Sequence, residues 1–214
     1  MTLHYIYHSC FVAEEADCLI VFDYWRDPDG WLAELLSRSE GREVYFVVSH
    51  FHEDHYNAAL PSLCASHTGW HLLPSYDTVK RRRIPRELPL AVLRFGESVE
   101  TPFFRLQAYH STDVGVCCVV TLRDGTKLFH AGDCNNWYFP HEETDRVKIT
   151  PEQMEKLFLS IVRDIRRDHP RVDYAMFPID PRLGEERMRG ANQLMQAIEV
   201  GELHPMHFCL PVEK

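Results

Sequence analysis

The sequence predicts a layered α/β fold in a single domain that spans residues 1–214. Short apolar and β-branched segments alternate with a few amphipathic segments of helical period along the whole chain. The 214 residues are enough for one large domain with a substantial core, and no linker-like change of composition divides them. This order of elements is compatible with a doubly wound sheet and with a sandwich of two sheets between helices.

The first quarter of the chain leads to a histidine-rich loop. Segments 6–11 and 18–22 are predicted strands, and 31–37 is a predicted helix with its leucines on one face. Residues 44–48 are a continuous β-branched and aromatic run, which suits a strand buried on both faces. Because this run leads directly to His50, we expect the histidines at a strand end, where a rigid scaffold presents functional groups.

The middle of the chain is rich in predicted strands. Asp124-Gly125 is typical of a hairpin turn between two of them. The predicted strands are 70–73, 90–95, 103–109, 114–122 and 127–131.

The last third predicts two helices and two strands. Thr150 is a good helix cap, with Pro151 in the first turn and Gln153 completing a capping box, so a helix is expected to reach Asp168. The remaining predicted elements are a strand at 172–178, a helix at 185–200 ended by Gly201, and a strand at 203–208.

The composition of the chain limits the kinds of partner and substrate that we expect. The formal net charge is −9, which argues against a broad nucleic-acid-binding surface but not against a small anionic substrate, since metal ions supply local positive charge. No apolar run is long enough to span a bilayer, and the N-terminal residues lack the pattern of a signal peptide, so a cytoplasmic location is expected. The seven cysteines form neither a disulfide framework nor a zinc-knuckle spacing and are predicted to be reduced thiols.

The segment from His50 to His55 carries the strongest chemical signal. It holds three histidines and an aspartate within six residues: His50, His52, Asp54 and His55. In an extended segment, side chains two apart share a face, so His50 and His52 can grip one ion while Asp54 and His55 face a second. Imidazole and carboxylate suit zinc and, less selectively, manganese or iron. A chance cluster in a polar loop is the improbable alternative.

Further ligands are expected at other strand ends. His110 follows the predicted strand 103–109, Asp133 follows 127–131, and His207 lies at the end of the last predicted strand. Each alone would be a weak signal, because a single histidine is usually a packed or surface residue. Their common position at strand ends makes the set stronger.

These residues resemble the metallo-β-lactamase superfamily over nearly the whole chain. The resemblance implies a four-layer αββα sandwich with two metal ions, most simply two Zn²⁺, at one edge. It implies that His50, His52 and His110 bind the first ion, that Asp54, His55 and His207 bind the second, and that Asp133 bridges them. Residues 7–11 and 205–208 resemble the compact branch that includes the ascorbate-phosphate lactonase.

Three residues are predicted to contact substrate. His8 ends the first predicted strand, Asn135 follows Asp133, and Arg182 follows the strand 172–178. Arg182 could hold a phosphate or carboxylate through a bidentate fork. A structural histidine at His8 and a surface ion pair at Arg182 are the competing interpretations. Asp23 follows a buried strand and is a candidate to orient a metal-bound histidine.

The predicted function is a binuclear metal-dependent hydrolase. Two ions about 3.5–4 Å apart would share a bridging hydroxide, and Asp54 would orient it and take its proton. The substrate is expected to be a small, anionic ester, lactone or phosphodiester; no oligomeric state is predicted. The alternatives are a metal-binding ligand sensor without turnover and a nuclease of the same fold. His52, where flavodiiron proteins carry Glu, argues against a redox di-iron protein.

Overall fold

The computed structural model describes residues 1–139 and 149–208. Its first sheet has the strand order β1-β2-β3-β4-β5 and its second the order β11-β10-β9-β8-β7-β6. The first sheet contains β1 (Thr2–Tyr7), β2 (Cys10–Glu14), β3 (Cys18–Phe22), β4 (Glu43–Val48) and β5 (Trp70–Pro74). The second contains β6 (Ser98–Glu100), β7 (Phe104–His110), β8 (Val116–Leu122), β9 (Lys127–His130), β10 (Arg171–Pro178) and β11 (Glu199–Met206).

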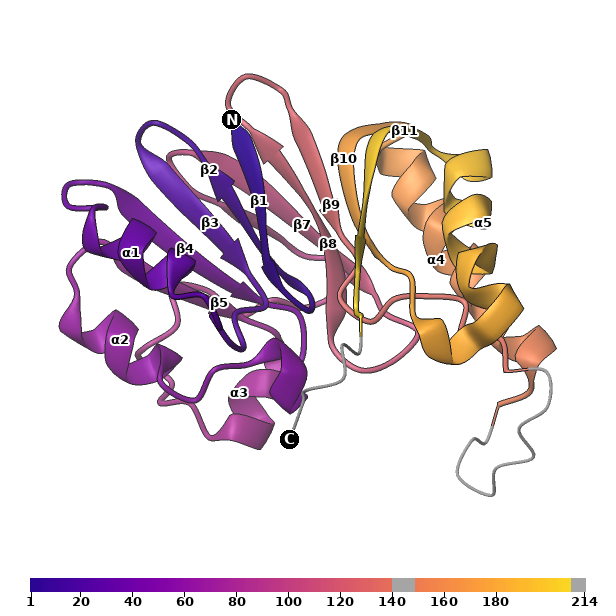
Figure 1. Cartoon of the computed structure of the whole chain (residues 1–214), viewed down its shortest axis with the longest axis horizontal. Helices are drawn as coiled ribbons and strands as arrows, with labels where there is room; N and C mark the ends of the chain where they lie inside the picture. The colour runs from indigo at the N-terminus through magenta and orange to yellow at the C-terminus, as the bar shows by residue number, and fades with distance from the viewer. Residues whose placement is uncertain (140–148, 209–214) are drawn as a thin grey trace.

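Helices cover the outer faces of both sheets (Figure 1). The helices α1 (Trp31–Ser37), α2 (Leu60–Ser66) and α3 (Tyr76–Arg82) lie beside the first sheet, and α4 (Pro151–Asp168) and α5 (Arg189–Ala197) beside the second. One apolar core joins the two sheets with α4 and α5, and a second lies between the first sheet and its helices. These layers confirm the predicted αββα sandwich.

Strand direction brings the functional segments to one edge. The neighbours β3 and β4 are parallel, as are β9, β10 and β11. The strands β1 and β7 run the same way as β3 and β9, because each is separated from it by one antiparallel neighbour. The segments that follow these strands therefore meet, and a hydrogen bond from Val116 N to Ser49 O (3.0 Å) joins the two sheets there.

The first predicted strand was wrong in its bounds. Segment 6–11 is divided between β1 and β2, because His8 adopts a left-handed conformation (φ 55°) and forms a tight turn with Ser9. Hydrophobicity alone did not show this turn. His8 consequently lies in the turn after β1 rather than within a longer strand.

Segment 90–95 is also not a strand. Leu93 makes an isolated bridge to Ser75, whereas Leu90 and Phe95 are exposed. The short helices α2 and α3 were not predicted, since each has only seven residues and too few turns to show a clear period.

The last predicted helix is shorter than expected. A 3₁₀ segment, η2 (Pro181–Met188), precedes α5, and β11 begins already at Glu199. Gly201 lies inside β11 instead of ending a helix. A β-carbon at Gly201 would lie 2.6 Å from the carbonyl oxygen of Asp173, so close packing against β10 explains the glycine.

Other local predictions are confirmed. α4 begins at Pro151 with the predicted capping box: Gln153 N donates to Thr150 Oγ1, and Thr150 N donates to Gln153 Oε1. Asp124-Gly125 lies in the turn between β8 and β9. The six cysteines within the described residues are free and buried, and Cys209 lies outside them. No helix in the described ranges is long and apolar enough to cross a membrane.

Candidate metal centre

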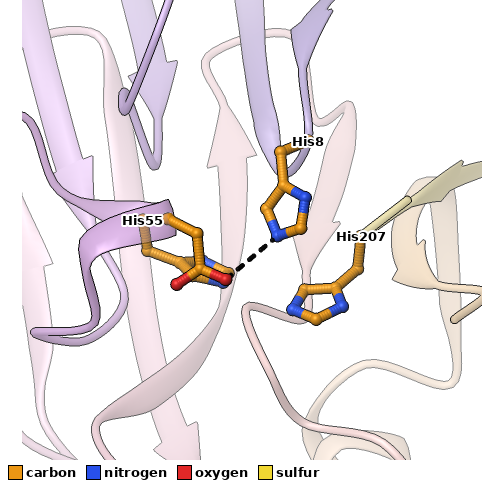
Figure 2. Close-up of side chains that lie close together, drawn as sticks. His8, His55 and His207 are labelled. Carbon is orange, nitrogen blue, oxygen red and sulfur yellow. Dashed lines mark ion pairs between the residues drawn. The ribbon is translucent and has the colours of Figure 1, made fainter. Parts of the chain in front are cut away.

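Three groups of possible metal-ligating side chains lie at this edge: two adjoining clusters of four residues, and a third group of Asp23, His50 and His55 that overlaps both. We call one the inner cluster; its members are His8, Asp54, His55 and His207. We call the other the outer cluster; its members are His50, His52, Asp113 and Asp133. In each cluster, one ligand atom from every residue lies within 4.8 Å of the others. Figure 2 shows the rings of His8, His55 and His207, which come from three different segments, turned towards one another.

The histidine loop contributes His50 and His52 to the outer cluster and Asp54 and His55 to the inner cluster. After β4 the chain bends at Phe51 and His52, and His50 Nε2 lies 3.0 Å from His52 Nδ1. The 3₁₀ turn η1 (Glu53–His55) then redirects Asp54 and His55. The helix α3 holds this loop from outside, because Arg82 Nε donates to Phe51 O at 2.8 Å.

Asp133 lies between the two clusters. Its Oδ2 is 3.3 Å from His50 Nε2, whereas its Oδ1 is 3.0 Å from His55 Nε2 and 3.1 Å from His207 Nε2. One carboxylate oxygen thus faces each set of imidazoles. This is the arrangement that a bridging ligand of two ions requires.

Four histidines are oriented by groups that lie on the side of the ring away from the centre and accept a hydrogen bond from Nδ1. His55 Nδ1 donates to Asp23 Oδ2 (2.6 Å), and His207 Nδ1 donates to Asp180 Oδ2 (2.8 Å). His8 Nδ1 donates to the carbonyl oxygen of Phe208 (3.1 Å). These acceptors hold Nδ1 and direct each Nε2 into the centre, as in metal sites with outer-shell carboxylates.

The fourth histidine, His50, is oriented in the same way by the hydroxyl group of Ser49. Ser49 Oγ donates its hydrogen to Asp23 Oδ2 (2.6 Å), so at 3.0 Å it accepts from His50 Nδ1. Asp23 therefore supports both clusters, His55 directly and His50 through Ser49. Its position behind the ligands agrees with the sequence-based interpretation of Asp23.

The donor atoms lack partners of their own. His8 Nε2, His55 Nε2, His207 Nε2 and Asp133 Oδ1 are buried and make no hydrogen bond. Buried polar atoms without partners are costly, and four that converge on one point require a common partner. Imidazole nitrogens and carboxylate oxygens at such distances fit a transition-metal ion.

The electrostatics of the centre favour a bound cation. Burial alone would raise the pKa of Asp133, but the nearby imidazoles of His55, His207 and His50 hold it well below its usual range. Burial would lower the pKa of His207, yet Asp133 and Asp180 raise it to about 9. Likewise, Asp133 and Asp23 outweigh burial and raise the pKa of His55. The carboxylates are therefore ionised, and they hold positive charge on the imidazoles that a metal ion can replace.

Backbone conformation at the centre is unusual. Three non-glycine residues here, His8, Asp23 and His207, adopt left-handed conformations with φ of 55°, 43° and 64°. Such conformations cost of the order of 1 kcal/mol each and persist where the surrounding structure holds them. Gly115 brings β8 against the histidine loop, since a β-carbon there would lie 2.1 Å from Ser49 O.

Asp113, and not His110, lies in the outer cluster. His110 is exposed at the end of β7 and stacks on Phe95, with ring centroids 3.6 Å apart, outside both clusters. Asp113 instead lies beside His52, with Oδ2 3.4 Å from His52 Nδ1. The geometry does not bring His110 to the first ion, and its ligand role stays a prediction. The sequence offered no signal for Asp113 beyond its position three residues after His110.

A pocket of about 490 Å³ opens over both clusters. Arg182 lies on its wall, where Asp180 holds the guanidinium through Nε and Nη2. The lining residues are His52, Asp54, Thr112, Asp113, Asp133, Trp137, Phe139, Ile149, Met154, Arg182 and His207.

The other two predicted substrate contacts lie elsewhere. Asn135 is fully buried and packs against α5, since a β-carbon at Gly190 would lie 2.1 Å from Asn135 Oδ1. It is not among the residues that line the pocket, so the geometry does not place it against a substrate. His8 is 4% exposed and belongs to the inner cluster rather than to the pocket wall.

Comparison with known proteins identifies the fold. No protein-family model matches the chain, and no curated protein matches its sequence. Among solved structures, Igni18, a metallo hydrolase from the archaeon Ignicoccus hospitalis KIN4/I, superposes with a TM-score of 0.66 at 19% identity, covering 96% of this chain and 81% of that one. The metallo-β-lactamase fold protein YhfI from Bacillus subtilis gives 0.61 at 13% identity, covering 94% and 78%.

A third structure, a possible metal-dependent hydrolase from Veillonella parvula DSM 2008, gives a TM-score of 0.50 at 14% identity, covering 82% of this chain and 70% of that one. At these identities the similarity establishes the fold alone. The chain adopts the metallo-β-lactamase fold, and its histidine and aspartate clusters lie at one edge of the sandwich.

Proposed function

We propose that this protein is a hydrolase that depends on two transition-metal ions. One observation carries the proposal: buried imidazole Nε2 atoms converge on Asp133, while acceptors behind each ring hold Nδ1. A packed core has no need of such an arrangement, whereas a metal centre requires it. The names of Igni18 and the Veillonella protein as hydrolases support the proposal by analogy.

The two clusters would divide the ligands. His50 and His52 would hold the first ion, Asp54, His55 and His207 the second, and Asp133 would face both. The donor set suits Zn²⁺, and Mn²⁺ or iron compete for the same atoms. When bound, two such ions supply Lewis acidity that makes water a nucleophile near neutral pH and polarises the attacked bond.

Asp54 is the proposed residue that orients the attacking water. Its side chain is about a third exposed and lines the pocket, so it can reach both the metal centre and a bound substrate. Burial raises its pKa, but His8 and His55 outweigh burial and hold the pKa well below its usual range. Asp54 is therefore ionised at neutral pH. It can accept a hydrogen bond from the attacking water and orient it.

The pocket favours a small anionic substrate. Its volume of about 490 Å³ lies within the range of small-molecule sites. Arg182 and Trp137 form part of the wall, and the guanidinium carbon lies 5.8 Å from the Trp137 ring centroid. Arg182 is 58% exposed although Asp180 orients it, so it can add a charge-assisted bond to a phosphate or carboxylate.

We propose esters, lactones and phosphodiesters as the substrate class. Residues 7–11 and 205–208 resemble the compact ascorbate-phosphate lactonase-like branch, which supports a phosphorylated lactone as the first compound to test.

The test is metal analysis followed by a substrate panel. Protein purified without chelator should hold about two metal ions per chain and turn over a member of the panel. Asp54→Ala should remove most of that activity, whereas Asp164→Ala, an exposed aspartate on α4, should not. Arg182→Ala should raise the KM for an anionic substrate and spare a neutral analogue.

The panel also separates the alternatives. Metal binding without turnover of any compound would favour a ligand sensor. Cleavage of structured RNA far faster than any small ester would favour a nuclease. Protein that binds no metal would overturn the proposal.

A further inference from the structure

His8 lies near the start of the chain but is held in place by residues near its end. It lies in the turn between β1 and β2, is 4% exposed and has a φ of 55°. His207 N donates to His8 O at 3.0 Å, and His8 Nδ1 donates to Phe208 O at 3.1 Å. These two hydrogen bonds clamp His8 onto the segment after β11.

The free nitrogen of His8 points into the inner cluster. Its Nε2 lies 3.3 Å from Asp54 Oδ2 (Figure 2), and its ring centroid is 4.4 Å from that of His207 and 5.7 Å from that of His55. One donor atom from each of these residues lies within 4.8 Å of the others. His8 therefore completes a set of three imidazoles around one carboxylate.

The hydrogen bond at Nδ1 leaves the other ring nitrogen of His8 for the cluster. The carbonyl oxygen of Phe208 can only accept, so Nδ1 of His8 is the donor there and Nε2 is the ring nitrogen left to face the cluster. This Nε2 is buried, makes no hydrogen bond and lies beside the Asp54 carboxylate, so the two groups are positioned to bind one cation together. The rings of His55 and His207 present the same pattern.

We propose that His8, through Nε2, is a protein ligand of the second metal ion, in addition to Asp54, His55 and His207. The proposal rests on the proposed two-metal function and extends it. It replaces the expectation that His8 contacts substrate. It also makes the turn between β1 and β2 part of the metal centre.

The variant His8→Asn tests the proposal, since asparagine tolerates the left-handed conformation better than other residues with side chains. His169→Asn is the matched control: His169 is 8% exposed and both of its ring nitrogens lack hydrogen bonds, but it belongs to neither cluster. The probe is Co²⁺, followed by its visible absorption and by competition with a chromophoric chelator. His8→Asn should weaken the binding of one of the two Co²⁺ ions by about 100-fold, and His169→Asn should weaken the binding of neither.

A measurement on the unmodified chain guards against a variant that does not fold. In ¹⁵N-histidine-labelled protein, adding Zn²⁺ should shift the Nε2 resonance of His8 together with those of His55 and His207. Unchanged Co²⁺ affinity in His8→Asn, or an unshifted Nε2 of His8 while His55 and His207 shift, would overturn the assignment of His8 alone. Failure of the unmodified chain to bind Co²⁺ or Zn²⁺ would overturn the proposed function as well.

Discussion

The inner and outer clusters use similar side chains but differ in support. In the inner cluster three imidazoles are 4% exposed or less, and each is held at Nδ1 by Phe208 O, Asp23 or Asp180. In the outer cluster only His50 has such support, through Ser49. The side chains of His52 and Asp113 are 41% and 37% exposed and line the pocket.

This difference predicts that the two clusters bind metal with different affinities. Ligands whose orientation is fixed before the metal arrives lose little entropy on binding, so the inner cluster should bind the tighter ion. Ligands that face an open pocket can rearrange when a substrate enters. The outer cluster is therefore expected to hold its ion more weakly and to lie nearer the chemistry.

The largest effect should come from Asp133, the member of the outer cluster that also faces imidazoles of the inner cluster. Because one oxygen of Asp133 faces each set of imidazoles, Asp133→Asn should weaken both ions and lower kcat/KM by about a thousandfold or more. Metal content after gel filtration and steady-state kinetics would measure this. Retention of one ion at unchanged affinity would assign Asp133 to a single cluster and break the comparison.

The outer partners provide a direct comparison of the two clusters. Asp180→Asn should weaken the inner ion by about 10- to 100-fold, because it removes the carboxylate behind His207. Ser49→Ala should weaken the binding of the outer ion by a smaller factor. It removes only the hydroxyl behind His50, and His52 has no comparable support to lose. Chelator competition gives both affinities. A larger loss in Ser49→Ala would reverse the ranking of the clusters.

A smaller effect should distinguish Asp113 from His110 as the remaining donor of the outer cluster. From the geometry we expect Asp113→Asn to weaken the outer ion by about tenfold and His110→Gln to change it little. Titration with Co²⁺ would separate the two variants. The opposite result would mean that His110 leaves its stack on Phe95 when metal binds, as the family resemblance implies.

The smallest effect concerns the stability of metal-free protein. The pKa of His207 is raised from 6.5 to about 9, so its stabilising contribution is complete below pH 6.5 and is lost as pH rises through about 9. Metal-free protein should therefore lose of the order of 1 kcal/mol of stability between pH 7 and 9.5. Urea unfolding with and without metal would check this. Metal-loaded protein should not show the loss, because an ion replaces the proton.

Much of the fold could be predicted because its signals are local. The capping box at Thr150 and the apolar run of β4 depend on neighbouring residues, and both were predicted with little error. The turn at His8 and the short helices α2 and α3 were missed, because a left-handed residue or seven helical residues leave no periodic pattern.

The sequence by itself determined the histidine loop, because the spacing of His50, His52, Asp54 and His55 sets which side chains share a face within six residues. Only the tertiary structure decided what surrounds the loop. Asp180 and His207 are 27 residues apart, Asp23 and His55 are 32 apart, and His8 and Phe208 are 200 apart. No spacing rule in the sequence connects such pairs. They meet because strands of both sheets end at the same edge of the sandwich.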